Sequence, residues 1–178
     1  MNKSLFLGKI GVLLALLAVM FTSCDNSFVY DDEGDCSVHY RIRFKYDKNM
    51  KFADAFANEI TSVALYVFDK SGVLVYQCAE NGETLSEENY AMTVELNPGE
   101  YEMLAWCGVG DGESFVVPQA NVGVTTKEDL TCKMNRVAAN GHGKVEKDLA
   151  PLFHGEMKVE FTDEPGVHYE TISLTKNT

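Results

Sequence analysis

The chain has 178 residues and a formal net charge of −12, because 27 acidic residues outnumber 15 lysines and arginines. Such an acidic surface repels phosphate backbones, which excludes nucleic acid as the expected partner. The length, with 46% hydrophobic residues, fits one domain that has its own core.

The first 23 residues have the pattern of a secretory signal. Lys3 and Lys9 precede an uninterrupted apolar run over residues 10–21. The small polar residues Thr22 and Ser23 close that run, which is the order of a cleavable signal peptide. A permanent transmembrane helix is the weaker interpretation, because it needs ~20 apolar residues.

The cysteine that follows this run indicates a lipoprotein signal instead of an ordinary secretory signal. The stretch resembles a bacterial lipobox, which predicts cleavage between Ser23 and Cys24 and attachment of acyl chains such as palmitate to Cys24. Several acyl chains on one residue hold a protein stably, because each buried methylene adds ~0.8 kcal/mol of membrane affinity. The alternative is an unmodified Cys24 beyond an ordinary cleavage site.

An acidic tether is predicted over residues 24–35. The stretch "DNSFVYDDEGD", which begins at Asp25, is acidic, poor in apolar residues and without periodicity. Residues 36–178 remain for one folded domain. Its four cysteines could form disulfides in an exported chain, but spacing alone leaves their pairing open. They are Cys36, Cys78, Cys107 and Cys132.

The first strand patterns indicate a sheet that includes a hairpin. Apolar and basic residues alternate through "VHYRIRFKY", from Val38 to Tyr46, which is the period of a half-buried strand. The run "ITSVALYVF", from Ile60 to Phe68, is apolar on both sides and indicates a central strand. The turn "DKSG" then lets residues 73–78 return as the second arm of a hairpin.

A second hairpin is predicted in "MTVELNPGEYEMLAWC", from Met92 to Cys107. Its turn would span Asn97–Glu100, with Pro98 fixing φ and Gly99 supplying the positive φ of a type II turn. The apolar alternation of "YEMLAWC" places its Trp in the core rather than on a sugar.

Helical periods are scarce, and strand patterns return near the carboxyl end, at 157–161 and 171–174. Short strands at regular intervals, separated by Gly, Pro and Asp turns, are typical of an all-β fold. The sequence therefore predicts an antiparallel β-sandwich.

No motif for catalysis, metal binding or cofactor binding stands out in the sequence. The four histidines are scattered, no GxSxG or HExxH occurs, and the glycine-rich stretch at 108–114 lacks the lysine of a phosphate loop. The expected protein is therefore not an enzyme, with no catalytic residue, no metal site and no cofactor.

Six stretches, in order, resemble the first domain of the fimbrial anchor lipoproteins, the FimB-like and minor-fimbria anchor proteins. They are "DDEGDCSVHYRIRFKYDKNMKFADAF" from Asp31, "VALYVFDKSGVLV" from Val63, "LNPGEYEMLAWCGV" from Leu96, "LTCKMNR" from Leu130, "LFHGE" from Leu152 and "ISLTKNT" from Ile172. The resemblance implies a transthyretin-like sandwich, a lipid anchor in the outer membrane, and fimbrial (pilin) subunits as partners. The protein would hold the base of a fimbrium, limit its length and serve cell adhesion.

The same resemblance implies more chain than is present. Family members usually continue into a second β-sandwich, so the first domain is expected to be incomplete at its last strand near Thr178. An open strand edge would invite an added strand from a partner. The alternative function is a surface lipoprotein that binds a glycan or a host protein through loops such as Gly108–Ser114, since sandwiches host many functions. Acidic residues soon after Cys24 also resemble the export signals of surface-exposed lipoproteins.

Overall fold

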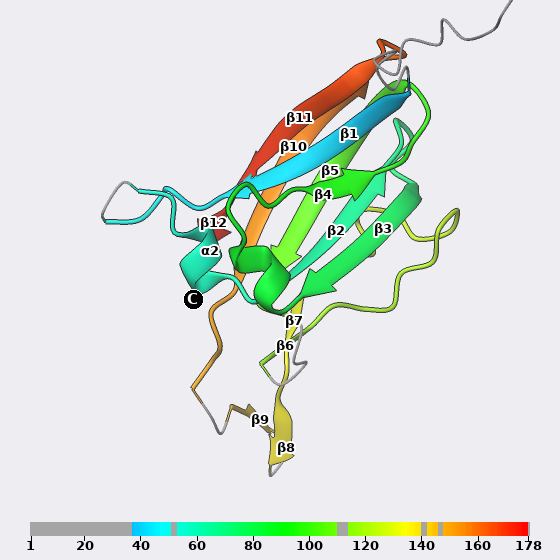
Figure 1. The fold of residues 1–178 in the computed structure, drawn as a ribbon. Coiled ribbons are helices and arrows are strands. Elements are labelled where there is room, and N and C mark those ends of the chain that lie inside the picture. Colours follow the sequence, from blue (N-terminus) through cyan, green and yellow to red (C-terminus); the bar gives the residue numbers. More distant parts are fainter. Residues whose placement is uncertain (1–36, 51–52, 110–113, 140–141, 146–147, 178) are drawn as a thin grey trace, which may run out of the picture. The chain divides into compact units, whose positions relative to one another are not determined.

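The computed structural model describes residues 37–50, 53–109, 114–139, 142–145 and 148–177. Strands dominate these residues, and two sheets share most of them (Figure 1). The three-stranded sheet has the order β11-β1-β4: Gly166–Ser173, Val38–Lys45 and Met92–Val94. The five-stranded sheet has the order β12-β10-β5-β2-β3: Thr175–Lys176, Phe153–Phe161, Gly99–Cys107, Ser62–Phe68 and Leu74–Asn81.

Smaller elements lie in the connections between these strands. Two strand pairs belong to the long excursion that joins β5 to β10. These are β6 (Phe115–Val116) with β7 (Lys133–Met134), and β8 (Val137–Ala139) with β9 (His142–Lys144). The helical pieces are α2 (Phe56–Glu59) and the 3-10 helix η1 (Glu83–Ser86). Within the described part of the chain, no helix has the length and apolar character of a membrane span.

Strand β1 confirms the predicted alternation. Tyr40, Ile42 and Phe44 are buried between the two sheets, whereas Arg41 and Lys45 are exposed on the outer face. The ring of Tyr40 stacks on Phe161 of β10, with 3.5 Å between ring centroids. This contact joins the two layers, so the all-β sandwich is confirmed.

Strand β2 is apolar on both faces because each face meets a different cluster. Val63, Leu65 and Val67 point into the main core between the sheets. Phe68 and the partly buried Tyr66 point to the other face, where they pack with residues of the excursion. The interior position of β2, between β5 and β3, and the predicted hairpin with β3 are both confirmed.

The predicted hairpin of residues 92–107 is wrong. β4 pairs with β1 in the three-stranded sheet, whereas β5 pairs with β2 and β10 in the five-stranded sheet. The "NPGE" segment therefore carries the chain from one layer to the other instead of closing a type II turn. Gly99 does not have a positive φ, because it is already the first residue of β5.

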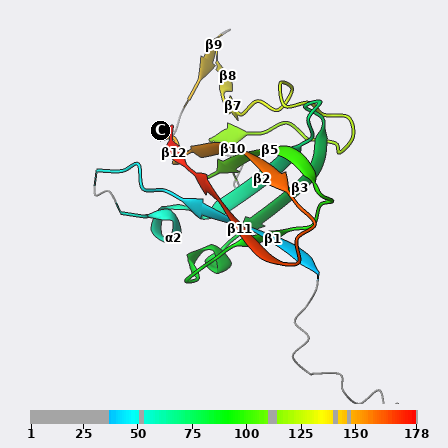
Figure 2. The same cartoon turned by 90° about the horizontal axis from the view of Figure 1, so that it is seen from above.

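The expectation of a purely antiparallel fold needs one correction. β11 runs parallel to β1 over all eight of its positions, from Val38 opposite Gly166 to Lys45 opposite Ser173. Parallel neighbours need a long connection, and here nearly the whole domain lies between the two strands. The other strand pairs in the two sheets are antiparallel, and Figure 2 shows β11 beside β1 from a second direction.

Gly155 allows the chain to pass closely where β11 returns over β10. A Cβ atom at this position would lie 2.6 Å from Ile172 Cγ2 and 2.6 Å from the Ser173 carbonyl oxygen. The chain then enters β12, which pairs with β10 only at Phe153 and His154. Lys176 of β12 also forms an ion pair of 2.9 Å with Glu59 of α2, which places the carboxyl end beside that helix (Figure 1).

Candidate docking surfaces

The predicted lipid-attachment residue, Cys24, and the preceding Ser23 lie outside the described residues, as does Cys36. Their roles stay predictions. The three other cysteines are free thiols, so no two of them form a disulfide with each other. They are Cys78 on β3, Cys107 on β5 and Cys132 before β7.

Burial makes Cys107 the least reactive of these thiols. The residue is fully buried in the main core, and burial raises the pKa of its thiol to about 12. Cys132 is partly exposed, and burial raises the pKa of its thiol to a smaller extent. Two effects slow the reaction of Cys107: the core keeps reagents away from its sulfur, and the raised pKa keeps the thiol neutral, whereas the thiolate is the reacting form.

We expect Cys107 to be alkylated much more slowly than Cys132 in the folded protein at about pH 8, well below the raised Cys107 pKa. Iodoacetamide labelling followed by mass spectrometry of the peptides measures both rates. The same reaction in guanidinium chloride is the control, since unfolding should bring the rates together. Equal rates in the folded protein would contradict the burial of Cys107.

One side of the sandwich has strand edges without a neighbouring strand among the described residues. β10 pairs with β5 along its whole length, but on its other edge β12 covers only Phe153 and His154. Beyond Gly155, which packs closely against Ile172 and Ser173, the edge of β10 from Glu156 to Phe161 is therefore open, as is the outer edge of β11, which pairs only with β1. Unpaired N–H and C=O groups along such edges can accept an added strand.

The opposite edge of the larger sheet is better protected. Leu74 at the start of β3 exchanges hydrogen bonds with the excursion: its N–H donates to the Thr125 carbonyl at 2.8 Å, and its carbonyl accepts from Gly123 at 2.7 Å. The Tyr76 hydroxyl donates to the Thr93 carbonyl of β4 at 3.4 Å. The outer edges of β4 and of β3 beyond Leu74 also lack a strand neighbour among the described residues, but the bond between Tyr76 and Thr93 links these two strands.

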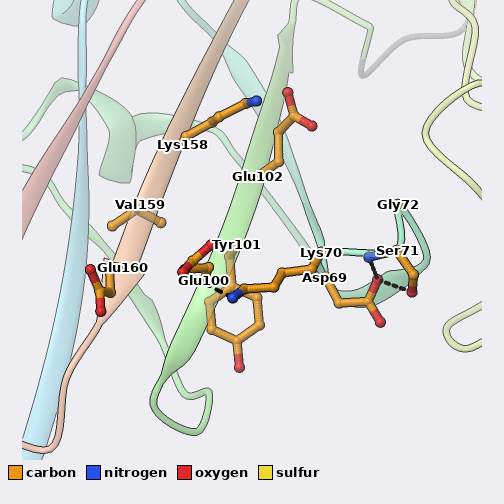
Figure 3. A pocket seen from close by; sticks show the side chains of 10 residues that line it. All are labelled: Asp69, Lys70, Ser71, Gly72, Glu100, Tyr101, Glu102, Lys158, Val159 and Glu160. Carbon is orange, nitrogen blue, oxygen red and sulfur yellow. Dashed lines mark hydrogen bonds and ion pairs between the residues drawn. The ribbon is translucent and has the colours of Figure 1, made fainter.

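A groove of about 720 Å³ lies on the outer face of the larger sheet, over β5 and between β10 and the β2–β3 turn. Figure 3 shows its lining from the β2–β3 turn, the start of β5 and the end of β10. The turn is well ordered by Asp69, whose carboxylate accepts hydrogen bonds from the Ser71 hydroxyl (2.6 Å) and the backbone N–H groups of Ser71 (2.9 Å) and Val73 (3.0 Å). These bonds, first that from the Ser71 hydroxyl, lower the pKa of Asp69.

The charges around this groove are mixed. Lys70 reaches Glu100 at 2.9 Å, and Glu100 lies opposite Glu160 in the strand register (Figure 3). Beside the groove, Lys127 of the excursion binds Glu102 at 2.7 Å and Glu156 at 2.9 Å. Partial burial lowers the pKa of Lys127, but the bonds to both carboxylates outweigh it, so the pKa is above its ordinary value. The surface is polar and can receive hydrogen-bonding groups.

The loop predicted as an alternative binding site, Gly108–Ser114, is only partly described, because residues 110–113 lie outside the described ranges. Gly108 itself has a φ of 86°, and a Cβ atom there would lie 2.0 Å from the Pro151 carbonyl oxygen. A glycine is therefore required at position 108, because the backbone at Pro151, which returns from the excursion, passes too close for any side chain. Among the described residues, no three His, Cys, Asp or Glu side chains gather as metal ligands would.

Comparisons with known proteins agree on one family. A model of the family described as fimbrillin-A associated anchor proteins Mfa1 and Mfa2 matches residues 32–178. The minor fimbrium anchoring subunit Mfa2 of Porphyromonas gingivalis is 22% identical over 142 residues, which are 76% of this chain and 43% of that protein. The solved structure of the fimbrial anchor protein Mfa2 of P. gingivalis has a TM-score of 0.63 at 17% identity, with 79% of this chain and 51% of that chain covered.

Another solved structure is more similar in sequence. A protein of Bacteroides thetaiotaomicron, described as a candidate polysaccharide-binding protein, is 38% identical with a TM-score of 0.66. The match covers 79% of this chain and 47% of that one. This chain therefore spans about half the length of the relatives that it matches.

Proposed function

Because the chain belongs to the family of fimbrillin-A associated anchor proteins Mfa1 and Mfa2, we propose that it is an outer-membrane lipoprotein that holds the base of a fimbrium and limits its length. The family match over residues 32–178 is the observation that carries this proposal. The predicted signal sequence, which ends at Ser23, supports the lipid anchor, since a cysteine directly after the small residues is where acyl chains are attached.

The task of such a protein is mechanical. Acyl chains on Cys24 would resist extraction from the membrane, and the acidic segment that follows would separate the domain from the bilayer. The domain needs one surface that binds a fimbrial subunit firmly. A strand added to an exposed edge gains backbone hydrogen bonds along its length, and adjacent pockets give it specificity.

The open edge of β10 is the docking surface that fits this task best. It runs from Glu156 to Phe161 without a strand partner among the described residues, and Lys158 and Glu160 of the same strand line one side of the groove in Figure 3. A subunit strand on this edge would place its outward side chains next to Lys158 and Glu160, which lie between that strand and the groove.

Site-specific photo-crosslinking tests this docking surface in cells. A photoreactive amino acid replaces Glu160, which is exposed on β10, and in a matched variant it replaces Ala79, which is exposed on β3. We expect covalent adducts with a fimbrial subunit from position 160 and few from position 79. Adducts of equal yield at both positions, or none at position 160, would count against docking on β10.

A second function is favoured by one observation, the 38% identity to a protein described as a candidate for polysaccharide binding. In that case the domain would bind a glycan on the cell surface or on a host. Capture of the protein from detergent-solubilised outer membranes separates the two functions. Recovery of fimbrial subunits supports the anchor, whereas recovery of the protein alone, with retention on immobilised polysaccharide, supports glycan binding.

A further inference from the structure

The outer face of the three-stranded sheet carries a basic stripe on an acidic protein. Arg41, Arg43 and Lys45 alternate with core residues along β1, so their side chains leave the same side of the sheet. The neighbouring outward residues of β11 are uncharged: Val167, Tyr169, Thr171 and Ser173. We call this surface, formed by the outward residues of β1 and β11, the basic face. No outward residue of these two described strands is a carboxylate.

The contacts of the basic face leave its charge largely available. Arg41 is exposed and forms no ion pair with a described residue. The Arg43 guanidinium lies over the ring of Tyr169, with its Cζ 4.0 Å from the ring centroid, which keeps the positive charge. Lys45 binds Asp47 at 2.8 Å and is half exposed. Val167 and Tyr169 are 49% and 45% exposed and add an apolar and an amphipathic side chain.

The other outer face of the sandwich has the opposite character. The inner residues of both sheets meet in one core, so the outward residues of β5 and β10 lie on the far side from the basic face. Four glutamates project from that far face, which also has the three lysines at positions 70, 127 and 158. These are Glu100, Glu102, Glu156 and Glu160. The domain is therefore electrically polarised across its two layers.

We propose that the basic face lies against the anionic headgroups of the membrane that carries the anchor. This inference rests on the proposed lipid attachment near residue 24, but on no fimbrial partner. The segment from Asp25 to Cys36 has 12 residues, which at ~3.5 Å each hold β1 within about 40 Å of the bilayer. A tethered domain is always close to the surface, so weak contacts suffice to choose the side that faces it.

Charge and side-chain chemistry both favour this orientation. Each Lys or Arg near an anionic membrane surface raises the ratio of domains with the basic face toward the membrane to domains with it away by about fivefold. The membrane surface repels the glutamates of the far face. Tyrosine is favoured at the headgroup level, because its ring is apolar and its hydroxyl polar. With the basic face on the membrane, the groove beside β10 points away from the bilayer, where a fimbrial subunit can reach it.

Hydroxyl-radical footprinting on vesicles tests the orientation. The chain from Asp25 onward, with an N-terminal histidine tag in place of Cys24, is held on vesicles that contain a nickel-chelating lipid. One vesicle type is phosphatidylcholine alone, and in the other phosphatidylglycerol replaces part of it. We expect oxidation of Tyr169 to be at least about threefold slower on the anionic vesicles. Oxidation of His154, on the outward side of β10, should be unchanged.

Two charge-reversed variants decide whether the basic face is responsible. Arg41→Glu with Lys45→Glu should abolish the protection of Tyr169. Lys70→Glu with Lys158→Glu changes the net charge equally on the far face, again with one ion-paired lysine, and should keep the protection. Equal oxidation of Tyr169 on both vesicle types, or loss of protection in both variants, would overturn the proposal. Because the tag replaces the acyl anchor and no subunit is present, this result is independent of the proposed function.

Discussion

Replacement of Cys24 by alanine is expected to move most of the protein from the outer membrane to the medium, together with the fimbriae that it holds. The physical reason is that each buried methylene of an acyl chain contributes ~0.8 kcal/mol, so loss of all chains removes the whole membrane affinity. Cell fractionation with immunoblotting measures the shift, and mass spectrometry of the amino-terminal peptide reports whether Cys24 is acylated.

Cys36→Ala is the matched control, because this cysteine lies outside the predicted cleavage motif but in the same part of the chain. The control protein should remain in the membrane fraction. Fimbriae that stay bound to cells although the Cys24→Ala protein has moved to the medium would refute the anchoring role. Acylation of Cys24 in the parent strain would support the lipid anchor. Normal cell-bound fimbriae in a strain that lacks this protein would refute the fimbrial function.

Gly108→Ala should produce a large loss of stability, because neither the space nor the backbone conformation at this position suits a side chain. The added Cβ would lie 2.0 Å from the Pro151 carbonyl oxygen, so the returning backbone must move. Overpacking of this kind costs 1–3 kcal/mol, and the positive φ of 86° adds about 1 kcal/mol. At about 3 °C per kcal/mol for a domain of this size, the Tm should fall by roughly 10 °C.

Gly123→Ala separates the two causes. Gly123 has a φ of 79°, but a Cβ atom there would have nothing within 4 Å. This variant should lose only the backbone contribution of about 1 kcal/mol. Thermal unfolding followed by circular dichroism compares both variants with the parent protein. Equal losses of Tm would show that the strand β5 can end without the close contact to Pro151.

Residue patterns were sufficient for the features that depend on neighbours along the chain. The alternation from Val38 to Lys45 defines which side of β1 is buried, because successive side chains of a strand point to opposite faces. The hairpin of β2 and β3 follows from a short turn, whose Asp69 and Gly72 have the expected turn chemistry. The apolar character of β2 on both faces indicated an interior strand, and the structure agrees.

The candidate docking edge was only partly accessible from sequence. The strand over residues 157–161 was predicted, and an open edge was expected at the closing strand near Thr178. Which edge is open depends on the strands beside β10, and β12 covers only Phe153 and His154. The requirement for glycine at position 155 could not be predicted either, because it arises from contacts with Ile172 and Ser173, which are distant in sequence.

What the sequence by itself determined is the strand class and the side of β1 that is buried, whereas the signal with its cysteine stays a prediction. Tertiary structure alone decided that β4 and β5 belong to different layers, that β11 runs parallel to β1, and that the two outer faces differ in charge. Periodicity describes one strand at a time and carries no information about its neighbour. The neighbours are chosen by contacts between distant residues, such as the Tyr40 hydroxyl that accepts the N–H of Thr162 at 2.6 Å across 122 positions.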